Sequence, residues 1–213
     1  MMDIGALLKS FIYLISASLL YPVLFLLVIL TFFIIVCAGS FFAEWVERLK
    51  LKQCPPLALP RILKTGTAAA MVSHRVNHYI KALTQTLRGD EPHRELAVEN
   101  LLQETTLGLW KSMDRLRILV RVAPSLGLIG TLIPMGTGLA ALGQGDMTQL
   151  STDLVIAFTT TVTGLAIGTT AFFFYTVKRR WVEEDIKNME LATEMLLSNR
   201  EQVNDETLSN AAN

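Results

Sequence analysis

Two long uncharged stretches limit what this chain can fold into. One runs from 122 to 142 and the other from 154 to 177, and neither contains Asp, Glu, His, Lys or Arg. A helix that crosses the hydrocarbon core of a bilayer, about 30 Å thick, needs roughly 20 apolar residues. Lipid offers no hydrogen bonds to backbone groups, so a short uncharged segment of this kind must be helical there. We predict a hairpin of two transmembrane helices, joined by the polar loop 143–153.

A third apolar run, from about 20 to 42, predicts a first transmembrane helix. Residues 1–19 are expected at the membrane interface, and Pro22 is expected in the first turn of the helix, where proline is tolerated. No small-residue cleavage site follows the run, and Val36 before Cys37 does not fit a lipid-attachment site. We interpret the run as a retained anchor rather than a signal peptide. With 51% hydrophobic residues, the chain is too apolar for an ordinary soluble domain.

Lys and Arg are distributed unevenly along the chain. Of the 19, Lys9 alone precedes the first apolar run, none lies in 143–153, and the rest lie in 43–121 or after 177. The positive-inside rule therefore predicts the N-terminus and the loop outside, with 43–121 and the C-terminal part in the cytoplasm. The formal net charge of zero gives no indication of a nucleic-acid partner. Cys37 and Cys54 do not form a disulfide framework, and we expect both to be reduced.

The segment 43–121 is expected to be a cytoplasmic helical hairpin. After a break at 55–60, apolar residues recur at helical spacing. A turn is predicted at 89–92, and the following helix should run directly into the second span. These residues form the two apolar stripes: Ala69, Val72, Val76, Tyr79, Leu83 and Leu87, then Val98, Leu102, Leu109, Met113, Leu116 and Val120.

Beyond 177 we expect a helix to about Ser198, a solvated face at the mixed charges of 178–190, and a disordered polar tail over 199–213. The predicted architecture is an all-α membrane protein with three spans and cytoplasmic helical extensions. Its four parts are 1–42, 43–121, 122–177 and 178–213.

No pattern in the chain predicts an enzyme, a metal site or a cofactor. His74 and His78 lie one helical turn apart, but no glutamate or third ligand accompanies them, so we interpret them as part of an exposed helix face. No phosphate-binding loop, nucleophile motif or carboxylate pair is present in the sequence. Function is therefore expected from the membrane hairpin.

Small residues and threonines occupy defined faces of the two spans of the hairpin. The second span has one such face, Pro124, Gly127, Thr131, Met135, Gly138 and Leu142. The third span has a face made of Ala157, Thr161, Gly164, Gly168 and Phe172, and an opposite stripe made of Thr152, Thr159, Thr163 and Thr170. Close helix packing explains these faces, and a pore lined by hydroxyls explains them as well. Since neither span has a titratable group, a proton carrier would have to come from another chain.

Two short segments of the hairpin carry a family resemblance. Residues 123–131, APSLGLIGT, resemble the APLLGLLGT signature of the MotA/TolQ/ExbB proton channel family, and 161–165, TVTGL, resemble the TA-x-GL motif of its third span. The likeness covers 118–180 and is nearest to the three-span ExbB/TolQ branch. It implies an inner-membrane homopentamer that surrounds two copies of a single-span partner of the ExbD/TolR/MotB type. That partner carries the membrane aspartate, and ion flow through the complex does work.

The resemblance also implies roles for individual residues. Thr131 and Thr161 would line the ion path, which leaves Thr159, Thr163 and Thr170 for helix packing or a second polar lining. The glycines expected at close helix contacts are Gly127, Gly130, Gly164 and Gly168; Gly127, Gly164 and Gly168 are also expected to let the partner helix approach.

The chain departs from the family pattern at several positions. Ile156 stands where ExbB-type sequences have a glutamate, and the nearest acid, Asp153, is expected only to cap the third helix. Pro124 and Pro134 are the predicted kink positions of the second span. The choice between proton and sodium therefore stays open. A non-conducting membrane scaffold of the same fold is the alternative function.

Overall fold

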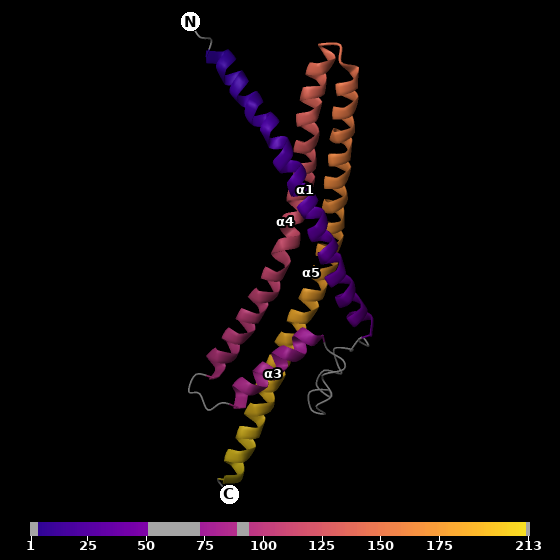
Figure 1. Ribbon diagram of the computed structural model, residues 1–213. Helices are drawn as coiled ribbons and strands as arrows, with labels where there is room; N and C mark the ends of the chain where they lie inside the picture. The colour runs from indigo at the N-terminus through magenta and orange to yellow at the C-terminus, as the bar shows by residue number, and fades with distance from the viewer. Residues whose placement is uncertain (1–3, 51–72, 89–93, 212–213) are drawn as a thin grey trace. The chain divides into compact units, whose positions relative to one another are not determined.

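The computed structural model describes residues 4–50, 73–88 and 94–211 (Figure 1). The described residues form four helices, the last two joined by a turn: α1 (Ile4–Lys50), α3 (His74–Arg88), α4 (Arg94–Leu142) and α5 (Met147–Ala211). Some predictions concern residues outside the described ones. They are Cys54, the break at 55–60, the stripe residues Ala69 and Val72, and the turn at 89–92.

Three of these helices are long and apolar enough to cross a membrane. The candidate spans are Ser10–Leu49, Glu95–Leu142 and Met147–Ser198. Within the described residues, this confirms the prediction of an α-helical membrane protein with three helices able to span the bilayer. At 1.5 Å per residue, the 65 residues of α5 make a helix of about 98 Å, much longer than the bilayer core. The N-outside orientation stays a prediction.

Helix boundaries differ from the predicted ones at several places. Because α1 begins at Ile4, Pro22 lies inside the helix rather than in its first turn. Residues 4–19 belong to the same helix as the first span. Helix α5, which contains the predicted third span, begins at Met147, within the predicted loop. It continues to Ala211, through the tail expected to be disordered. As predicted, α4 is continuous with the cytoplasmic helix before it, and neither Pro124 nor Pro134 interrupts it.

The chain divides into two compact units, and α1, α4 and α5 contribute to both. Unit 1 comprises 1–41 and 114–176, and its core is built mainly from aliphatic side chains, with alanines and two phenylalanines. At one end of this core Phe41 of α1 stacks on Phe174 of α5, with ring centroids 4.4 Å apart. Many large apolar side chains of unit 1 point outward instead, for example Phe25, Leu128 and Phe158, as expected of helices that face lipid or other subunits.

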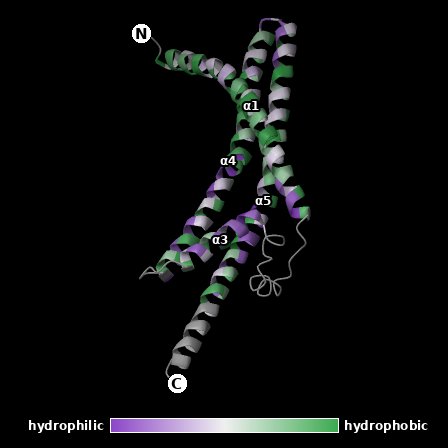
Figure 2. Cartoon of the chain, turned by 60° about the horizontal axis from the view of Figure 1, so that its bottom comes forward, coloured by the Kyte–Doolittle hydropathy of each residue, from purple (hydrophilic) through white to green (hydrophobic). Residues whose placement is uncertain are grey.

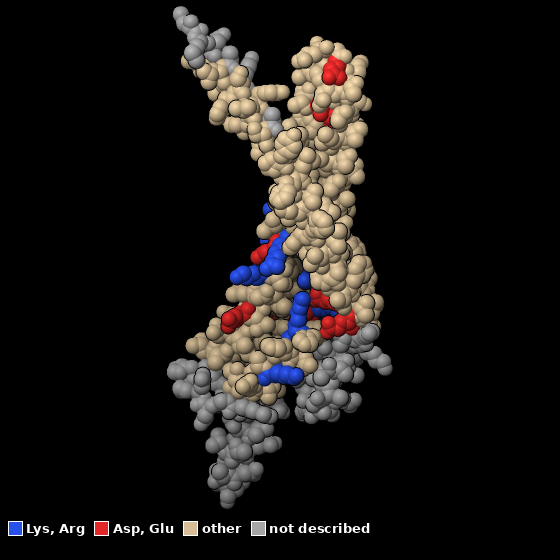
Figure 3. All heavy atoms as spheres, viewed as in Figure 1, with Lys and Arg blue, Asp and Glu red and all other residues tan. Residues whose placement is uncertain are grey.

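The charged residues of the membrane hairpin, 122–177, lie close to its loop. Figure 2 shows the α4–α5 hairpin green to white along most of its length and purple around its loop. In Figure 3 the acidic residues visible on the hairpin lie close to that loop. The sequence explains both views, because Asp146 and Asp153 are the only charged residues from 122 to 177.

Unit 2 comprises 42–113 and 177–213, and its core contains most of the described residues of the two predicted stripes, although Leu102 is only half-buried. The buried residues are Val76, Tyr79, Ile80, Leu83 and Leu87 of α3, Val98, Leu109 and Met113 of α4, and Val182, Met189 and Ala192 of α5. The hydroxyl of Tyr79 lies 2.7 Å from that of Thr193, so a polar contact joins α3 to α5 inside this core.

Candidate functional site

The two helices of the membrane hairpin approach closely because glycines face each other. A Cβ added to Gly164 would lie 2.7 Å from the carbonyl oxygen of Ala123 and 2.8 Å from the Cα of Gly127. Both neighbours are backbone atoms, which side-chain motion cannot move aside. A glycine is therefore required at 164 for α4 and α5 to pack at this distance.

The close contact continues along the hairpin in both directions. A Cβ on Gly168 would lie 2.5 Å from the Cγ of Pro124, and one on Gly130 would lie 2.9 Å from the Cβ of Thr160. We expected Gly127, Gly164 and Gly168 to leave room for a partner helix. In the single chain these glycines lie at the contact between α4 and α5, as expected of close helix packing; the approach of a partner helix stays a prediction.

Thr131 and Thr161, the residues predicted to line an ion path, meet in this interface. Their hydroxyl groups are hydrogen-bonded to each other, and Thr131 Oγ1 also donates to the carbonyl oxygen of Gly127 at 2.9 Å. Neither side chain is fully buried. The α4–α5 contact therefore holds two adjoining hydroxyls that stay partly exposed.

The second threonine stripe points away from this interface. Thr152, Thr159 and Thr170 are exposed and Thr163 is half-buried. Thr159 and Thr163 donate to carbonyl oxygens one turn earlier on α5, at 2.7 and 2.8 Å. Within one chain the stripe does not pack α5 against α4, and the Thr160–Thr161 side of α5 does so instead. Contact of the stripe with another subunit or with a polar path stays a prediction.

Asp153 differs from its predicted role. The N-cap of α5 is Asp146, whose Oδ1 accepts a hydrogen bond from the backbone N–H of Gln149 at 2.9 Å. Gly145 precedes it with a φ of 81°, a turn conformation that starts the helix earlier than expected. Asp153 lies almost two turns further on, only 7% exposed.

Both carboxylate oxygens of Asp153 have hydrogen-bond donors. The hydroxyl of Thr137 on α4 lies 2.8 Å from Oδ2, and the amide Nε2 of Gln149 lies 3.0 Å from Oδ1. Gly138 makes the approach possible, because a Cβ there would lie 3.2 Å from the Cβ of Asp153. Sequence reasoning missed this contact because it ended the loop at Asp153 and treated the residue as a cap.

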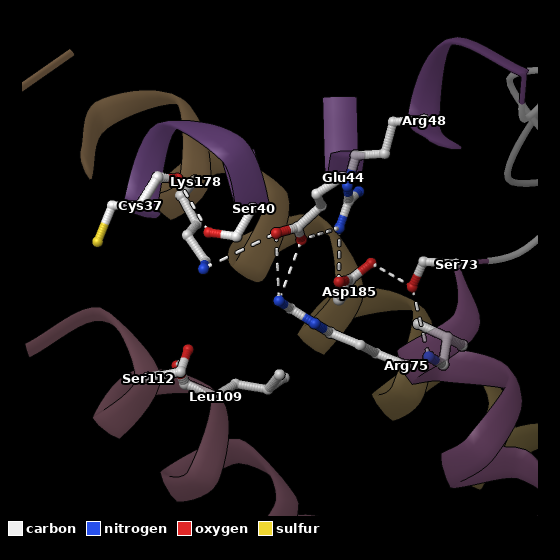
Figure 4. A network of polar contacts seen from close by, with 11 residues as sticks. Cys37, Ser40, Glu44, Arg48, Ser73, Arg75, Leu109, Ser112, Lys178 and Asp185 are labelled. Carbon is white, nitrogen blue, oxygen red and sulfur yellow. Dashed lines mark hydrogen bonds and ion pairs between the residues drawn. The ribbon is translucent and has the colours of Figure 1, made fainter. Parts of the chain in front are cut away.

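A network of charged residues forms in unit 2, where α1, α3 and α5 meet (Figure 4). Arg48 of α1 donates to Asp185 of α5 at 2.7 Å, and Ser73 donates to the other oxygen at 2.9 Å. The carboxylate of Glu44 forms ion pairs with Arg75, at 3.1 Å between Oε1 and Nη2, and with Lys178, at 3.8 Å between Oε2 and Nζ. The network ties the end of α1 to α5 and to the start of α3.

The prediction of a solvated face at 178–190 is wrong for Asp185, which is 1% exposed. Burial raises the pKa of Asp185 by desolvating its carboxylate, and the charge of Arg48 and the hydrogen bond from Ser73 offset part of that rise. Burial likewise raises the pKa of Tyr79, partly offset by its hydrogen bond with Thr193.

The two histidines are placed as predicted. His74 and His78 are both exposed on α3. Among the residues that the structure describes, no group of three His, Cys, Asp or Glu side chains could hold a metal ion.

Three long apolar helices, two of which form a close-packed hairpin rich in Gly and Thr, define a multi-pass membrane protein. A family description confirms the resemblance: the MotA/TolQ/ExbB proton channel family matches residues 61–191. The chain belongs to this family, whose members are channel-type transport proteins.

A curated relative agrees with this assignment. The chain is 29% identical over 102 residues to a homolog of the biopolymer transport protein ExbB from Methanothermobacter thermautotrophicus. The aligned part covers 47% of this chain and 37% of that protein, so the chain matches little more than a third of its relative's length. No solved structure matches the chain.

Proposed function

We propose that this chain is the pentameric subunit of an ion-driven motor in the inner membrane, with the proton as the ion. Two copies of a single-span protein of the ExbD/TolR/MotB type would occupy the centre of the pentamer. Each would carry a membrane aspartate, and ion flow between that aspartate and the pentamer would drive work outside the membrane.

The pair formed by Thr131 and Thr161 carries this proposal. Their hydroxyls meet one helical turn from the close contact of Gly127 with Gly164, and both stay partly exposed. A threonine hydroxyl donates and accepts hydrogen bonds, but it is not a titratable group and does not release its proton to water. The pair therefore suits a polar wall along which a titratable group from a partner moves, and such a group is the usual marker of ion passage in membranes.

The proposed orientation places the α4–α5 loop outside and unit 2 in the cytoplasm. It rests on the distribution of Lys and Arg, of which none lies in 143–153 and three adjoin the end of the third span at 178–180. Cytoplasmic flanks of membrane helices are enriched in these residues.

Replacement of Thr161 by Val tests the polar wall, because valine keeps the shape of threonine and removes the hydroxyl. We expect Thr161→Val to assemble with the partner but to lower passive proton influx into proteoliposomes by roughly tenfold or more. The matched control is Thr176→Val, since Thr176 is an exposed threonine on the same helix whose hydroxyl donates to the carbonyl oxygen of Phe172 one turn earlier.

The variant Thr170→Val tests whether the ion path follows the Thr131–Thr161 pair or the stripe made of Thr152, Thr159, Thr163 and Thr170. Proton influx that is lost in Thr170→Val and kept in Thr161→Val would move the ion path to the second stripe. Influx equal to wild type in both variants would contradict a threonine-lined path and favour the non-conducting scaffold.

A further inference from the structure

The hairpin contains one acidic side chain that the proposed function does not use. Asp153 is 7% exposed, inside α5, and faces α4. No Lys, Arg or His occurs from 122 to 177 to neutralise it. The other charge of the hairpin is Asp146, which is also negative. The charged residues of chain segment 1–41 are Asp3 and Lys9, whose side chains lie outside the described part of the structure. A buried carboxylate without a neighbouring cation is costly and is retained at functional sites in membranes.

The hydrogen bonds around Asp153 accommodate both protonation states. The Thr137 hydroxyl lies 2.8 Å from Asp153 Oδ2 and 3.0 Å from the carbonyl oxygen of Pro134. Because a hydroxyl has a single proton, it donates to one of these acceptors at a time. When Asp153 is ionised, Thr137 donates to the carboxylate. When Asp153 is protonated, its own O–H can donate to Thr137, which then donates to Pro134.

The position of Asp153 relates it to the threonine pair. Asp153, Ala157 and Thr161 follow one another at four-residue spacing on the side of α5 that packs against α4. Asp153 and Ala157 are buried there, and the carbonyl of Ala157 lies 3.4 Å from Thr131 Oγ1. Eight residues of helix separate Asp153 from Thr161, which is about 12 Å along the axis.

We propose that Asp153 takes up and releases a proton at the loop end of the α4–α5 hairpin. This inference rests on the proposed function and adds to it a titratable group of the chain itself, one that exchanges protons with water before they reach the Thr131–Thr161 pair. The carboxylate takes its proton from water, and on releasing it returns to the state in which Thr137 donates to it.

A test on the purified full-length chain needs no partner. Dicyclohexylcarbodiimide, an apolar reagent, modifies protonated carboxyl groups, and peptide mass spectrometry locates the product. We expect modification at Asp153 that falls as the pH is raised, with no protection by sodium chloride relative to choline chloride. If sodium chloride blocks the modification, Asp153 binds sodium rather than a proton, and the inference is overturned. No modification at any pH would overturn the inference.

A second test separates proton transfer from a structural tie. Asp153→Asn keeps an oxygen that accepts from Thr137 but cannot be protonated, whereas Thr137→Val removes the tie and leaves the acid. We expect Asp153→Asn to assemble with the partner and to lose proton influx by roughly tenfold or more, with partial recovery in Asp153→Glu. A purely structural role predicts the reverse order, with Asp153→Asn active and Thr137→Val unable to assemble, and that order would overturn the inference.

The outcomes for the two proposals differ. One outcome would contradict only the role of Asp153: proton conduction by wild type and by Asp153→Asn, together with loss of conduction in Thr161→Val. The proposed motor function would then stand. If wild type with its partner never conducts but carbodiimide modifies Asp153 in a pH-dependent way, the motor function fails and the titration of Asp153 stands.

Discussion

At the scale of single residues, Asp185 holds together three segments of unit 2 at an electrostatic cost. Its pKa lies above the usual value because burial desolvates the carboxylate, and Arg48 and Ser73 offset only part of this effect. A raised pKa in the folded state means that folding favours the protonated form. Its contribution is therefore fully present below the unfolded-state pKa of about 3.9, and is lost as the pH rises through the higher pKa of the folded protein.

We predict that Asp185→Asn changes how the stability of the chain depends on pH. Asparagine does not titrate; its one side-chain oxygen can accept from Arg48, and its NH2 group can donate to the hydroxyl of Ser73. Relative to this variant, wild type should lose stability as the pH rises from about 4 towards neutrality. Thermal unfolding in detergent, measured for both proteins at several pH values, gives the comparison. Parallel curves, or a gain by wild type with rising pH, would contradict the raised pKa.

Some residues of the site were predictable from the sequence and others were not. Thr131 and Thr161 follow from local motifs on two helices, and the structure brings them together. The surroundings of Asp153 and Asp185 depend on residues far away in the chain. Thr137 lies 16 residues from Asp153, and Arg48 lies 137 residues from Asp185. Helical periodicity places a residue on a face but does not say what that face contacts.

At the scale of elements, α4 and α5 form a hairpin whose close spacing depends on glycines at the helix contact. We predict that Gly164→Ala lowers the free energy of unfolding by about 1–3 kcal/mol, as overpacking typically does. The reason is that its Cβ would lie under 3 Å from backbone atoms of Ala123 and Gly127. Thermal unfolding and the yield of assembled complex measure the effect.

The control for this prediction is Gly136→Ala on α4. A Cβ at Gly136 meets nothing within 4 Å, and alanine favours a helix over glycine by about 1 kcal/mol in water. Unfolding of Gly136→Ala should therefore match wild type or occur at a higher temperature. A loss of stability as large as that of Gly164→Ala would show that the interface does not explain the effect.

The elements were more predictable in kind than in extent. Uncharged runs of about 20 residues suffice to predict spans, and α1, α4 and α5 each contain one. Their ends were harder to predict because polar residues do not stop a helix unless a turn or a cap intervenes. Met147 to Asp153 therefore joined α5 although the composition resembled a loop. Pro22, Pro124 and Pro134 each remove one backbone hydrogen bond, and the remaining bonds keep α1 and α4 continuous.

At the scale of the whole molecule, one chain leaves much apolar surface uncovered. Large side chains of the hairpin such as Leu132, Val162 and Leu165 are exposed in the single chain. Lipid or further copies of the chain must cover them. The family assignment makes a ring of identical subunits the expected arrangement, and a partner is expected to bring the aspartate that the threonine pair needs.

The central claim is that five copies of this chain enclose two copies of a single-span, aspartate-bearing partner. Native mass spectrometry of the detergent-purified complex, with candidate partners co-expressed, measures this directly. We predict a particle of five chains when the chain is expressed alone, and one of five chains plus two partners when the right partner is present. A stable assembly with a different number of copies, or one that never takes up such a partner, would contradict the motor and leave a membrane scaffold.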